Sequence, residues 1–306
     1  MDKVYDLIVV GGGPAGYTTA LYGARAGLDV VVLEKLSVGG QMALTHMIDN
    51  YPGYDEGIDG FDLGQKMRQG AARFGAATKM VQVLSAQLDA KVKAVHTDSG
   101  VFYGRAVVIA TGAEPRKLGL PNEDALTGQG VHYCAACDGM FYRGKTVVLV
   151  GGGNSAAAEA LVLSRVAKKV ILIHRRDSLR AEKAASQAVE RAENIEIRWN
   201  SQVIELLHDG KIRGVRLQDV TSGDQSEIHC DGVFISIGRV PATSLVKGQL
   251  TLDDAGYIVA GEDTKTNLSG VFAAGDVRTK AVRQIVTATA DGASAAYAVE
   301  RYLAGH

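Results

Sequence analysis

Cysteine is scarce in this chain: only Cys134, Cys137 and Cys230 occur among its 306 residues. So few thiols do not make a disulfide framework, and a reducing compartment suits such a sequence. In that setting the Cys134/Cys137 pair is more readily catalytic or metal-binding than a static cross-link. A chain of this length can bury roughly 75% of its unfolded surface, so it needs no covalent support to fold.

The sequence also lacks an excess of charge of either sign and any long apolar run. Its formal net charge is -1 and its Lys and Arg residues are scattered, which argues against binding driven by net charge to nucleic acid or a membrane surface. The apolar run in MDKVYDLIVVGGG is too short to span a bilayer and lacks a signal-peptide layout. We therefore expect a soluble cytoplasmic protein with no nucleic-acid or membrane partner.

Glycine, by contrast, is abundant, and two glycine-rich segments repeat one pattern. LIVVGGGPAGYTTALYGARAGLDVVVLEK begins at Leu7, and VVLVGGGNSAAAEALVLSRVAKKVILIHR begins at Val147, 140 residues later. Each reads as a buried strand, a glycine turn, an alanine-rich helix and a second strand. Both turns match G-x-G-x-x-G/A, with the small residues Gly11, Gly13 and Gly16, then Gly151, Gly153 and Ala156. The pattern predicts two dinucleotide-binding folds, each with a pyrophosphate at a helix N-terminus.

The two copies differ where they should select their ligands. Glu34 stands 23 residues after Gly11, where a carboxylate accepts hydrogen bonds from a ribose diol. The matching position of the second copy holds His174, and three guanidinium groups follow, those of Arg175, Arg176 and Arg180. Guanidinium groups there suit a 2′-phosphate. We expect FAD or NAD in the first fold and NADPH in the second; a solvated helix start is the alternative for the arginines.

The chain is expected to cross twice between two domains. RAVVIATGAEPR and DGVFISIGRVPAT each predict a strand followed by a proline-marked exit. The second domain, residues 114–242, would then be inserted into a first domain built from residues 1–113 and 243–306. Turn signals between residues 193 and 231 predict an antiparallel meander, and the alanine-rich segment 283–303 predicts a C-terminal helix. The fold class is α/β with two Rossmann-like domains.

The cysteine pair lies in HYCAACDGMFYRG, shortly before the second glycine turn. Structural zinc needs four ligands, usually in two pairs, and no second pair exists. Covalent haem would need histidine where Asp138 stands. A passive pair of buried thiols remains an alternative interpretation. A redox role explains more, because a Cys-x-x-Cys pair exchanges readily and Asp138 could transfer the proton that exchange requires. We therefore predict no metal, a structural role for Cys230, and electrons that pass from nicotinamide to flavin to the dithiol.

Together these motifs resemble the low-molecular-weight, bacterial-type thioredoxin reductases over essentially the whole chain. The resemblance rests on GGGPAGYTTALY, GGQ, IDNYPG, ATG, CAACDGMFYRGK, GGGNSAAAEA, HRRDSLRAEK, GVFAAGDV and the RQ at positions 283–284. It implies a flavoprotein disulfide reductase fold in which an NADPH domain is inserted into a split FAD domain. It also implies a homodimer that reduces thioredoxin.

The resemblance implies roles for individual residues. Cys137 would face the flavin, Cys134 would attack thioredoxin, and Asp138 would be the acid/base. The residues expected at FAD are Gly11, Gly13, Pro14, Ala15, Gly16, Glu34, Lys35, Gly40, Gln41, Asn50, Thr111, Gly112, Gly275, Asp276, Arg283 and Gln284. Those expected at NADPH are Gly151, Gly153, Asn154, Ser155, His174, Arg175, Arg176 and Arg180. Between the cysteines stand two alanines where many members have Ala-Thr, a change that should affect the disulfide only modestly.

Four other functions share this core. The reductase of a peroxidase would carry a further thioredoxin-like region at its N-terminus, which we do not expect because the chain reaches its first strand almost at once. A dithiol oxidase that uses oxygen, or a reductase fed by ferredoxin or flavin, would not need the arginine set. A non-catalytic flavin-binding module would not need both cysteines and Asp138.

Overall fold

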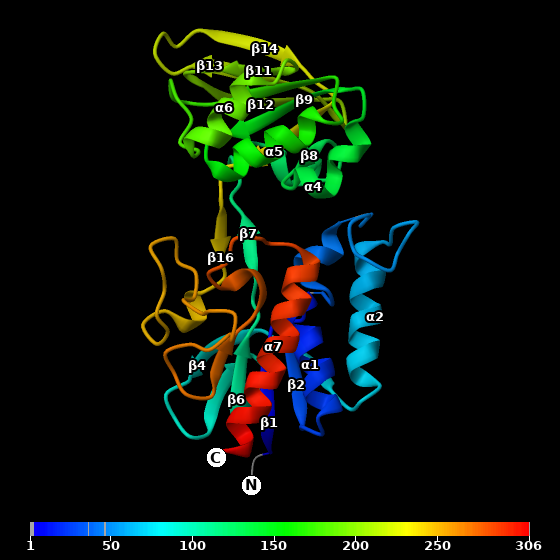
Figure 1. Cartoon of the computed structure of the whole chain (residues 1–306), viewed down its shortest axis with the longest axis vertical. Helices are drawn as coiled ribbons and strands as arrows, with labels where there is room; N and C mark the ends of the chain where they lie inside the picture. The colour runs from blue at the N-terminus through cyan, green and yellow to red at the C-terminus, as the bar shows by residue number, and fades with distance from the viewer. Residues whose placement is uncertain (1–2, 36, 46, 306) are drawn as a thin grey trace. The chain divides into compact units, whose positions relative to one another are not determined.

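The computed structural model describes residues 3–35, 37–45 and 47–305 (Figure 1). The chain divides into two compact units. One, here called the split unit, contains residues 1–114 and 240–306; the other, the inserted unit, contains residues 115–239. Each unit holds one copy of the repeated strand, glycine turn, helix and strand.

The split unit is built on a seven-stranded sheet in the order β3-β2-β1-β6-β5-β4, with β17 also paired to β6. Strands β1, β2, β3, β6 and β17 pair in parallel, whereas β4 and β5 are antiparallel. Apolar residues fill β1 from Leu7 to Val10 because both faces of the sheet are covered there. The bounds are β1 (Val4–Val10), β2 (Val30–Glu34), β3 (Ala77–Met80), β4 (Val83–Gln87), β5 (Lys93–Thr97), β6 (Gly100–Ile109) and β17 (Val271–Ala273).

Helices cover one face of this sheet, and helix α7 runs alongside α1 (Figure 1). The two helices approach so closely that a Cβ atom on Gly292 would overlap the carbonyl oxygen of Ala15. Gly292 permits this approach because it has no side chain. The chain between η3 and η4 covers the opposite face with Val246, Leu250 and Ile258. The bounds are α1 (Pro14–Arg25), α2 (Gly60–Ala72), α7 (Ile285–Ala304), η1 (Gly40–Leu44), η3 (Ser244–Val246) and η4 (Gly275–Val277). The predicted C-terminal helix is confirmed.

The inserted unit contains a five-stranded parallel sheet in the order β11-β10-β9-β15-β8. Helices α5 and α6 cover one face, and a three-stranded antiparallel sheet, β12-β13-β14, covers the other. The strands are β8 (Val131–His132), β9 (Thr146–Gly151), β10 (Lys169–Ile173), β11 (Ile195–Arg198), β12 (Ser201–His208), β13 (Ile212–Asp219), β14 (Gln225–His229) and β15 (Gly232–Ser236). The helices are α3 (Glu123–Leu126), α4 (Ala135–Asp138), α5 (Asn154–Ser164), α6 (Lys183–Arg191) and η2 (Gly139–Tyr142).

The expected meander is correct for β12 to β14 and wrong for the strand that precedes them. Strand β11 pairs in parallel with β10, with Val170 opposite Ile195. It follows helix α6, so the chain from β10 through α6 to β11 is a crossover, which requires a parallel partner. None of the helices in the described chain is both long enough and apolar enough to cross a membrane.

The two segments that join the units pair with each other as β7 (Ala113–Pro115) and β16 (Arg239–Pro241). Two further hydrogen bonds extend this pairing. The Thr111 hydroxyl donates to the Ala242 carbonyl oxygen at 2.7 Å, and the Ala242 amide donates to the Gly112 carbonyl oxygen at 3.0 Å. Each of these strands ends in a proline, Pro115 or Pro241. Proline has no amide hydrogen to donate, and a strand end at a sheet edge tolerates that loss.

A buried ion cluster fixes helix α7 to the turn η4. The Asp291 carboxylate accepts hydrogen bonds from the Gly275 amide at 2.8 Å, from Arg278 Nη2 at 2.6 Å and from Lys280 Nζ at 2.9 Å. Burial would raise the pKa of Asp291, but the two cations and the amide outweigh it, so the net pKa lies below the ordinary value. The Asp291 carboxylate is thereby the buried counter-ion of two buried cations.

We expect Asp291→Asn to lower the free energy of unfolding by about 4 kcal/mol near neutral pH, because it removes the buried counter-ion of Arg278 and Lys280 and leaves Arg278 only the exposed carboxylate of Glu262 at 4.0 Å. The deficit should shrink in acid. The native pKa is depressed, so the stability that ionised Asp291 contributes is present above its unfolded pKa and lost as pH falls through the native one. Urea unfolding at neutral and at acidic pH would measure this loss of stability. Glu300→Gln, an exposed change on the same helix, is the control, and a loss no larger than the control's would contradict the interpretation.

Candidate active site

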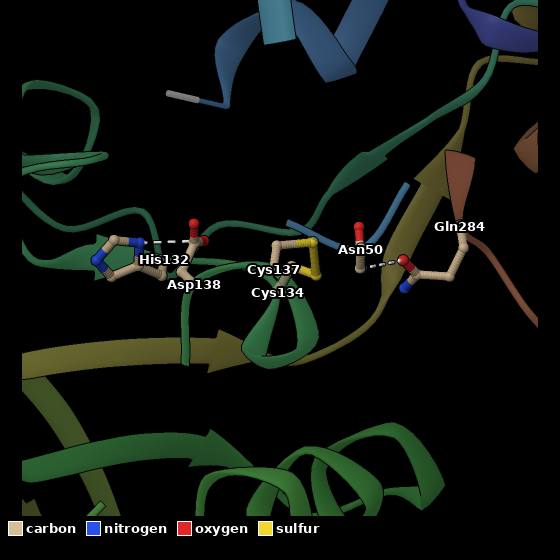
Figure 2. The surroundings of a disulfide bond; sticks show 6 residues. All are labelled: Asn50, His132, Cys134, Cys137, Asp138 and Gln284. Carbon is tan, nitrogen blue, oxygen red and sulfur yellow. Dashed lines mark hydrogen bonds and ion pairs between the residues drawn. A yellow bond between two sulfur atoms is a disulfide. The ribbon is translucent and has the colours of Figure 1, made fainter. Parts of the chain in front are cut away.

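A single helical turn carries the two cysteines. Cys134 is the N-cap of α4 and Cys137 lies within it, and a disulfide joins them with their Cα atoms 5.3 Å apart (Figure 2). The amides of Cys137 and Asp138 both donate to the carbonyl oxygen of Cys134, which closes the turn. The pair follows the carboxyl end of strand β8, the edge at which parallel α/β sheets place their sites. Both cysteines are partly exposed.

Asp138, the predicted acid/base, contacts a buried histidine. Its Oδ2 lies 3.1 Å from Nδ1 of His132 (Figure 2), and Nε2 of His132 lies 2.7 Å from the Tyr142 hydroxyl. Burial, and then the charge of Asp138, raises the pKa of Tyr142 to about 12. The tyrosine is therefore protonated at neutral pH and can donate to the imidazole. In the sequence His132 stands as an isolated histidine, and nothing in its spacing predicts a partner.

A second carboxyl group near this turn escaped the sequence analysis. Glu159 lies on α5 beside the Ala135 amide, and burial raises its pKa to about 7, against the lowering effects of Arg239, the Ser236 side chain and that amide. Its Oε2 makes no hydrogen bond among the described residues. A glutamate between alanines in SAAAEALV is the only sequence signal, and such a residue is ordinarily exposed.

We expect Glu159→Gln to flatten the pH dependence of stability. The native pKa lies above the unfolded one, so ionisation opposes folding: wild-type stability should fall as pH rises from about 4.5 to about 7 and level off above. At pH 8 the variant should be more stable than wild type by about 2 kcal/mol, a figure already discounted for partial exposure. At pH 4 this advantage should vanish. Urea unfolding at both pH values measures it, with the exposed Glu190→Gln as control; parallel pH profiles would refute the assignment.

The glycine turn of the inserted unit is tied to the arginine-bearing segment. The Arg180 amide donates to the Gly152 carbonyl oxygen and the Glu182 amide donates to Asn154 Oδ1, both at 2.7 Å. Helix α5 begins at Asn154 and Ser155 with Gly153 as its N-cap, and it has neither a side-chain cap nor an acidic residue in its first turn. Its first amides thus remain for an anion.

His174 and the three arginines behave differently. His174 is buried against the glycine turn, where a Cβ atom on Gly152 would overlap its ring. Burial lowers its pKa, so the ring is neutral at neutral pH, and its Nε2 has no hydrogen-bond partner within the described part of the chain. The arginines are exposed and form no ion pair with any described residue: Arg175, Arg176 and Arg180. Their charge therefore remains for a phosphate.

The glycine turn of the split unit is equally tight. Gly11 has a φ of +106°, and a Cβ atom on Gly16 would overlap the carbonyl oxygen of Gly11. Glu34 at the end of β2 accepts a hydrogen bond from the Gly12 amide at 2.7 Å. Glu34 therefore lies beside the turn at the end of β2, and the backbone uses part of its hydrogen-bonding capacity.

The structure brings most of the other predicted residues of the split unit to this turn or to the N-terminus of α7. Helix α1 begins with Pro14 and Ala15 after its N-cap Gly13, and Gly40 approaches Gly13. Gly275 approaches Ala15, Asp276 follows it in η4, and Thr111 and Gly112 follow β6.

The remaining predicted residues lie near the N-terminus of α7 or are exposed. Asn50 Nδ2 donates to Gln284 Oε1 at 3.1 Å (Figure 2), and the Arg283 guanidinium lies 4.0 Å from the ring centre of Tyr257. Lys35 and Gln41 are exposed, and among the described residues no hydrogen bond or ion pair of their side chains reaches the turn.

Glycine N-caps distinguish the two glycine-turn helices from the other α-helices of the described chain. Helix α2 is capped by Asp59 and α7 by Gln284. Helices α1 and α5 have glycine N-caps, no side-chain cap and no acid in the first turn. Both N-termini therefore suit the pyrophosphate of a dinucleotide, and the residues around them fit FAD and NADPH.

Among the described residues, neither a further reactive thiol nor a metal-binding cluster occurs. Cys230 is buried, and burial raises the pKa of its thiol to about 12, which makes it a poor nucleophile at neutral pH. Within residues 3–35, 37–45 and 47–305, no group of three or more His, Cys, Asp or Glu side chains could hold a metal ion.

The chain matches a known family along nearly its whole length. The model of the pyridine nucleotide-disulphide oxidoreductases matches residues 5–292. The chain belongs to this family. A thioredoxin reductase from Streptomyces clavuligerus is 47% identical over 307 residues, covering 99% of this chain and 95% of the relative. One from Peptoclostridium acidaminophilum is 42% identical over 309 residues, covering 99% and 98%.

Solved structures agree with these relatives. The thioredoxin reductase of Streptococcus pyogenes MGAS5005 is 40% identical, covers 100% of both chains and superposes with a TM-score of 0.91. The resemblance and the fold class predicted from the sequence are thus confirmed. This pyridine nucleotide-disulphide oxidoreductase is a flavoprotein enzyme of the thioredoxin reductase type, with FAD and NADPH as its cofactors.

Proposed function

We propose that this chain uses the Cys134/Cys137 pair to reduce the disulfide of thioredoxin. The observation that carries the proposal is the partly exposed disulfide on a turn that also bears Asp138. FAD, when bound, supplies the transfer of an electron pair from NADPH to that disulfide. Two electrons and two protons convert the disulfide to two thiols.

The dithiol then exchanges with thioredoxin in two steps. Cys134, as thiolate, attacks one sulfur of the thioredoxin disulfide and forms a mixed disulfide, and the other thioredoxin sulfur leaves and is protonated. Cys137, as thiolate, then attacks Cys134, which restores the disulfide and releases the second thioredoxin thiol. Asp138 accepts the proton lost by an attacking thiol and returns it to a leaving thiolate.

We assign FAD to the split unit and NADPH to the inserted unit. Glu34 at the end of β2 and the uncapped helix α1 support the first assignment, with the other FAD residues expected from the sequence around them. The arginines at the end of β10 and the uncapped helix α5 support the second, since an uncompensated guanidinium group suits a 2′-phosphate.

The proposal extends to the partner and the setting of the enzyme. Thioredoxin is the protein substrate, as the names of the full-length relatives suggest. A homodimer is supported by large aromatic side chains exposed on the split unit, those of Tyr22, Phe61 and Tyr297. The small number of cysteines supports a reducing cytoplasm.

Cys134→Ser should separate the two halves of the reaction. We expect flavin bleaching by NADPH under anaerobic conditions to stay within about twofold of wild type, while thioredoxin reduction falls at least about 1000-fold, because a serine hydroxyl does not attack a disulfide at neutral pH. Stopped-flow absorbance and the appearance of thioredoxin thiols measure the two steps. Cys230→Ala, which changes only the buried thiol, should retain both; full turnover in Cys134→Ser would refute the electron path.

Arg175→Ala with Arg176→Ala should weaken NADPH selectively. Loss of charge-assisted bonds to a 2′-phosphate should raise the KM for NADPH by about 10- to 100-fold and the KM for NADH by no more than about threefold. Steady-state kinetics with both nucleotides measures the difference. Arg191→Ala, an exposed change at the end of α6, is the control; equal increases for the two nucleotides would rule out the 2′-phosphate assignment.

A further inference from the structure

We propose that His132 is a positioning residue that orients the Asp138 carboxylate for proton transfer at the dithiol. Tyr142 in turn sets the tautomer of the imidazole. The inference rests on the proposed acid/base role of Asp138, which the experiment below tests separately.

The hydrogen bonds of His132 define one arrangement of protons. Tyr142 is protonated at neutral pH, so its hydroxyl is the donor to Nε2 of the imidazole at 2.7 Å. The imidazole proton then lies on Nδ1 and is donated to Oδ2 of Asp138 at 3.1 Å. His132 is the only hydrogen-bonding or ionic partner of the Asp138 side chain among the described residues. One carboxylate oxygen is thus held by the histidine, and the second is left for the thiols.

Aromatic packing holds the imidazole ring in this orientation. The ring stacks on Phe234 of β15, with 5.2 Å between centres and 27° between planes. Tyr142 meets both rings edge-on, at 5.2 Å from His132 and 5.4 Å from Phe234. His132 is buried at the end of β8. The ring therefore cannot turn away from Asp138 without disturbing the two aromatic rings packed against it.

The cysteine turn needs such a support. Helix α4 has only four residues, and so short a helix is a weak frame on its own. The Asp138 amide bonds to the Cys134 carbonyl oxygen, which fixes the main chain but leaves the carboxylate free to rotate. An acid/base must stay within hydrogen-bond reach of the proton it transfers. The bond from His132 removes that rotation.

Other titratable groups surround this array and must be separated from it in a pH profile. Tyr142 itself interacts with Asp231 and Cys230, which lie next to β15. Glu159 of α5 lies beside the Ala135 amide, with Arg239 of β16 near it. Burial raises the pKa of Glu159 to about 7, so its titration falls within the range of interest. Each profile is therefore also recorded in the Glu159→Gln background.

The experiment compares four changes in the FAD-loaded enzyme with thioredoxin and NADPH, from pH 5.5 to pH 9. Asp138→Asn should lower thioredoxin reduction by about 100-fold or more. His132→Phe, which keeps a ring against Phe234 but loses both hydrogen bonds, should lower kcat by about tenfold with KM for thioredoxin unchanged. Tyr142→Phe should give a smaller decrease in the same direction. His132→Gln, whose amide can still donate to Asp138, should recover part of the rate.

Three readouts distinguish positioning from a general structural effect. Flavin bleaching by NADPH should equal that of wild type in the His132 and Tyr142 variants. His132→Phe should shift the pH profile of exchange, whereas a structural loss would lower the rate equally at every pH. In the double variant His132→Phe/Asp138→Asn the rate should equal that of Asp138→Asn alone, because the histidine acts only through the carboxylate. His229→Phe, an exposed histidine on β14, is the control.

Each contrary result has its own meaning. If Asp138→Asn is slow while His132→Phe keeps the wild-type rate and profile, the positioning role is wrong and the proposed function stands. If Asp138→Asn is as fast as wild type, the acid/base role fails, and the inference fails with it. If the double variant is about tenfold slower than Asp138→Asn, His132 acts independently of the carboxylate and the inference is overturned. Should His132→Phe fail to fold, Tyr142→Phe and His132→Gln carry the same test.

Discussion

The close approach of a helix N-terminus to the end of a parallel strand is the constraint on which both units depend. In the split unit no side chain fits between Gly16 and the carbonyl oxygen of Gly11, so helix α1 begins almost in contact with β1. In the inserted unit Ala156 takes the place of the third glycine and is fully buried. This approach directs the first amides of each helix outward at the sheet edge, and the absence of a side-chain cap leaves them for a phosphate.

Residues that repeat a local pattern could be predicted from the sequence with good accuracy. The strand, turn, helix and strand of each copy occur where the apolar runs and glycines place them, because a buried parallel strand and an alanine-rich helix have strong local signals. Glu34 and His174 stand at the ends of β2 and β10, where counting from the first glycine places them. Strand β11 was misassigned because its pairing depends on the crossover through α6, which the alternation of Ile195 and Ile197 does not encode.

Contacts between distant or irregularly spaced polar groups could not be predicted. Asp291 has no sequence signal that it meets Arg278 and Lys280, since the turn η4 and the helix α7 determine that distance. His132 meets Asp138 only because β8 ends where the cysteine turn begins and because Phe234 of the neighbouring strand supports the ring. In each case the sequence supplies the charged or titratable group, and tertiary packing supplies its partner.

The inserted unit separates two kinds of polar group by their burial. At the end of β10 the charged arginines are exposed while the buried imidazole of His174 is neutral, so the surface keeps its positive charge and the interior carries none. Around the cysteine turn the groups that can carry protons, Asp138 and Glu159, are instead partly buried, and His132 holds the carboxylate of Asp138. A phosphate is attracted best by charge that water can reach without desolvation. A proton is transferred best where a fixed partner and restricted water hold the donor and acceptor in place. One small sheet can therefore serve both functions, because the two kinds of group follow different strands of it.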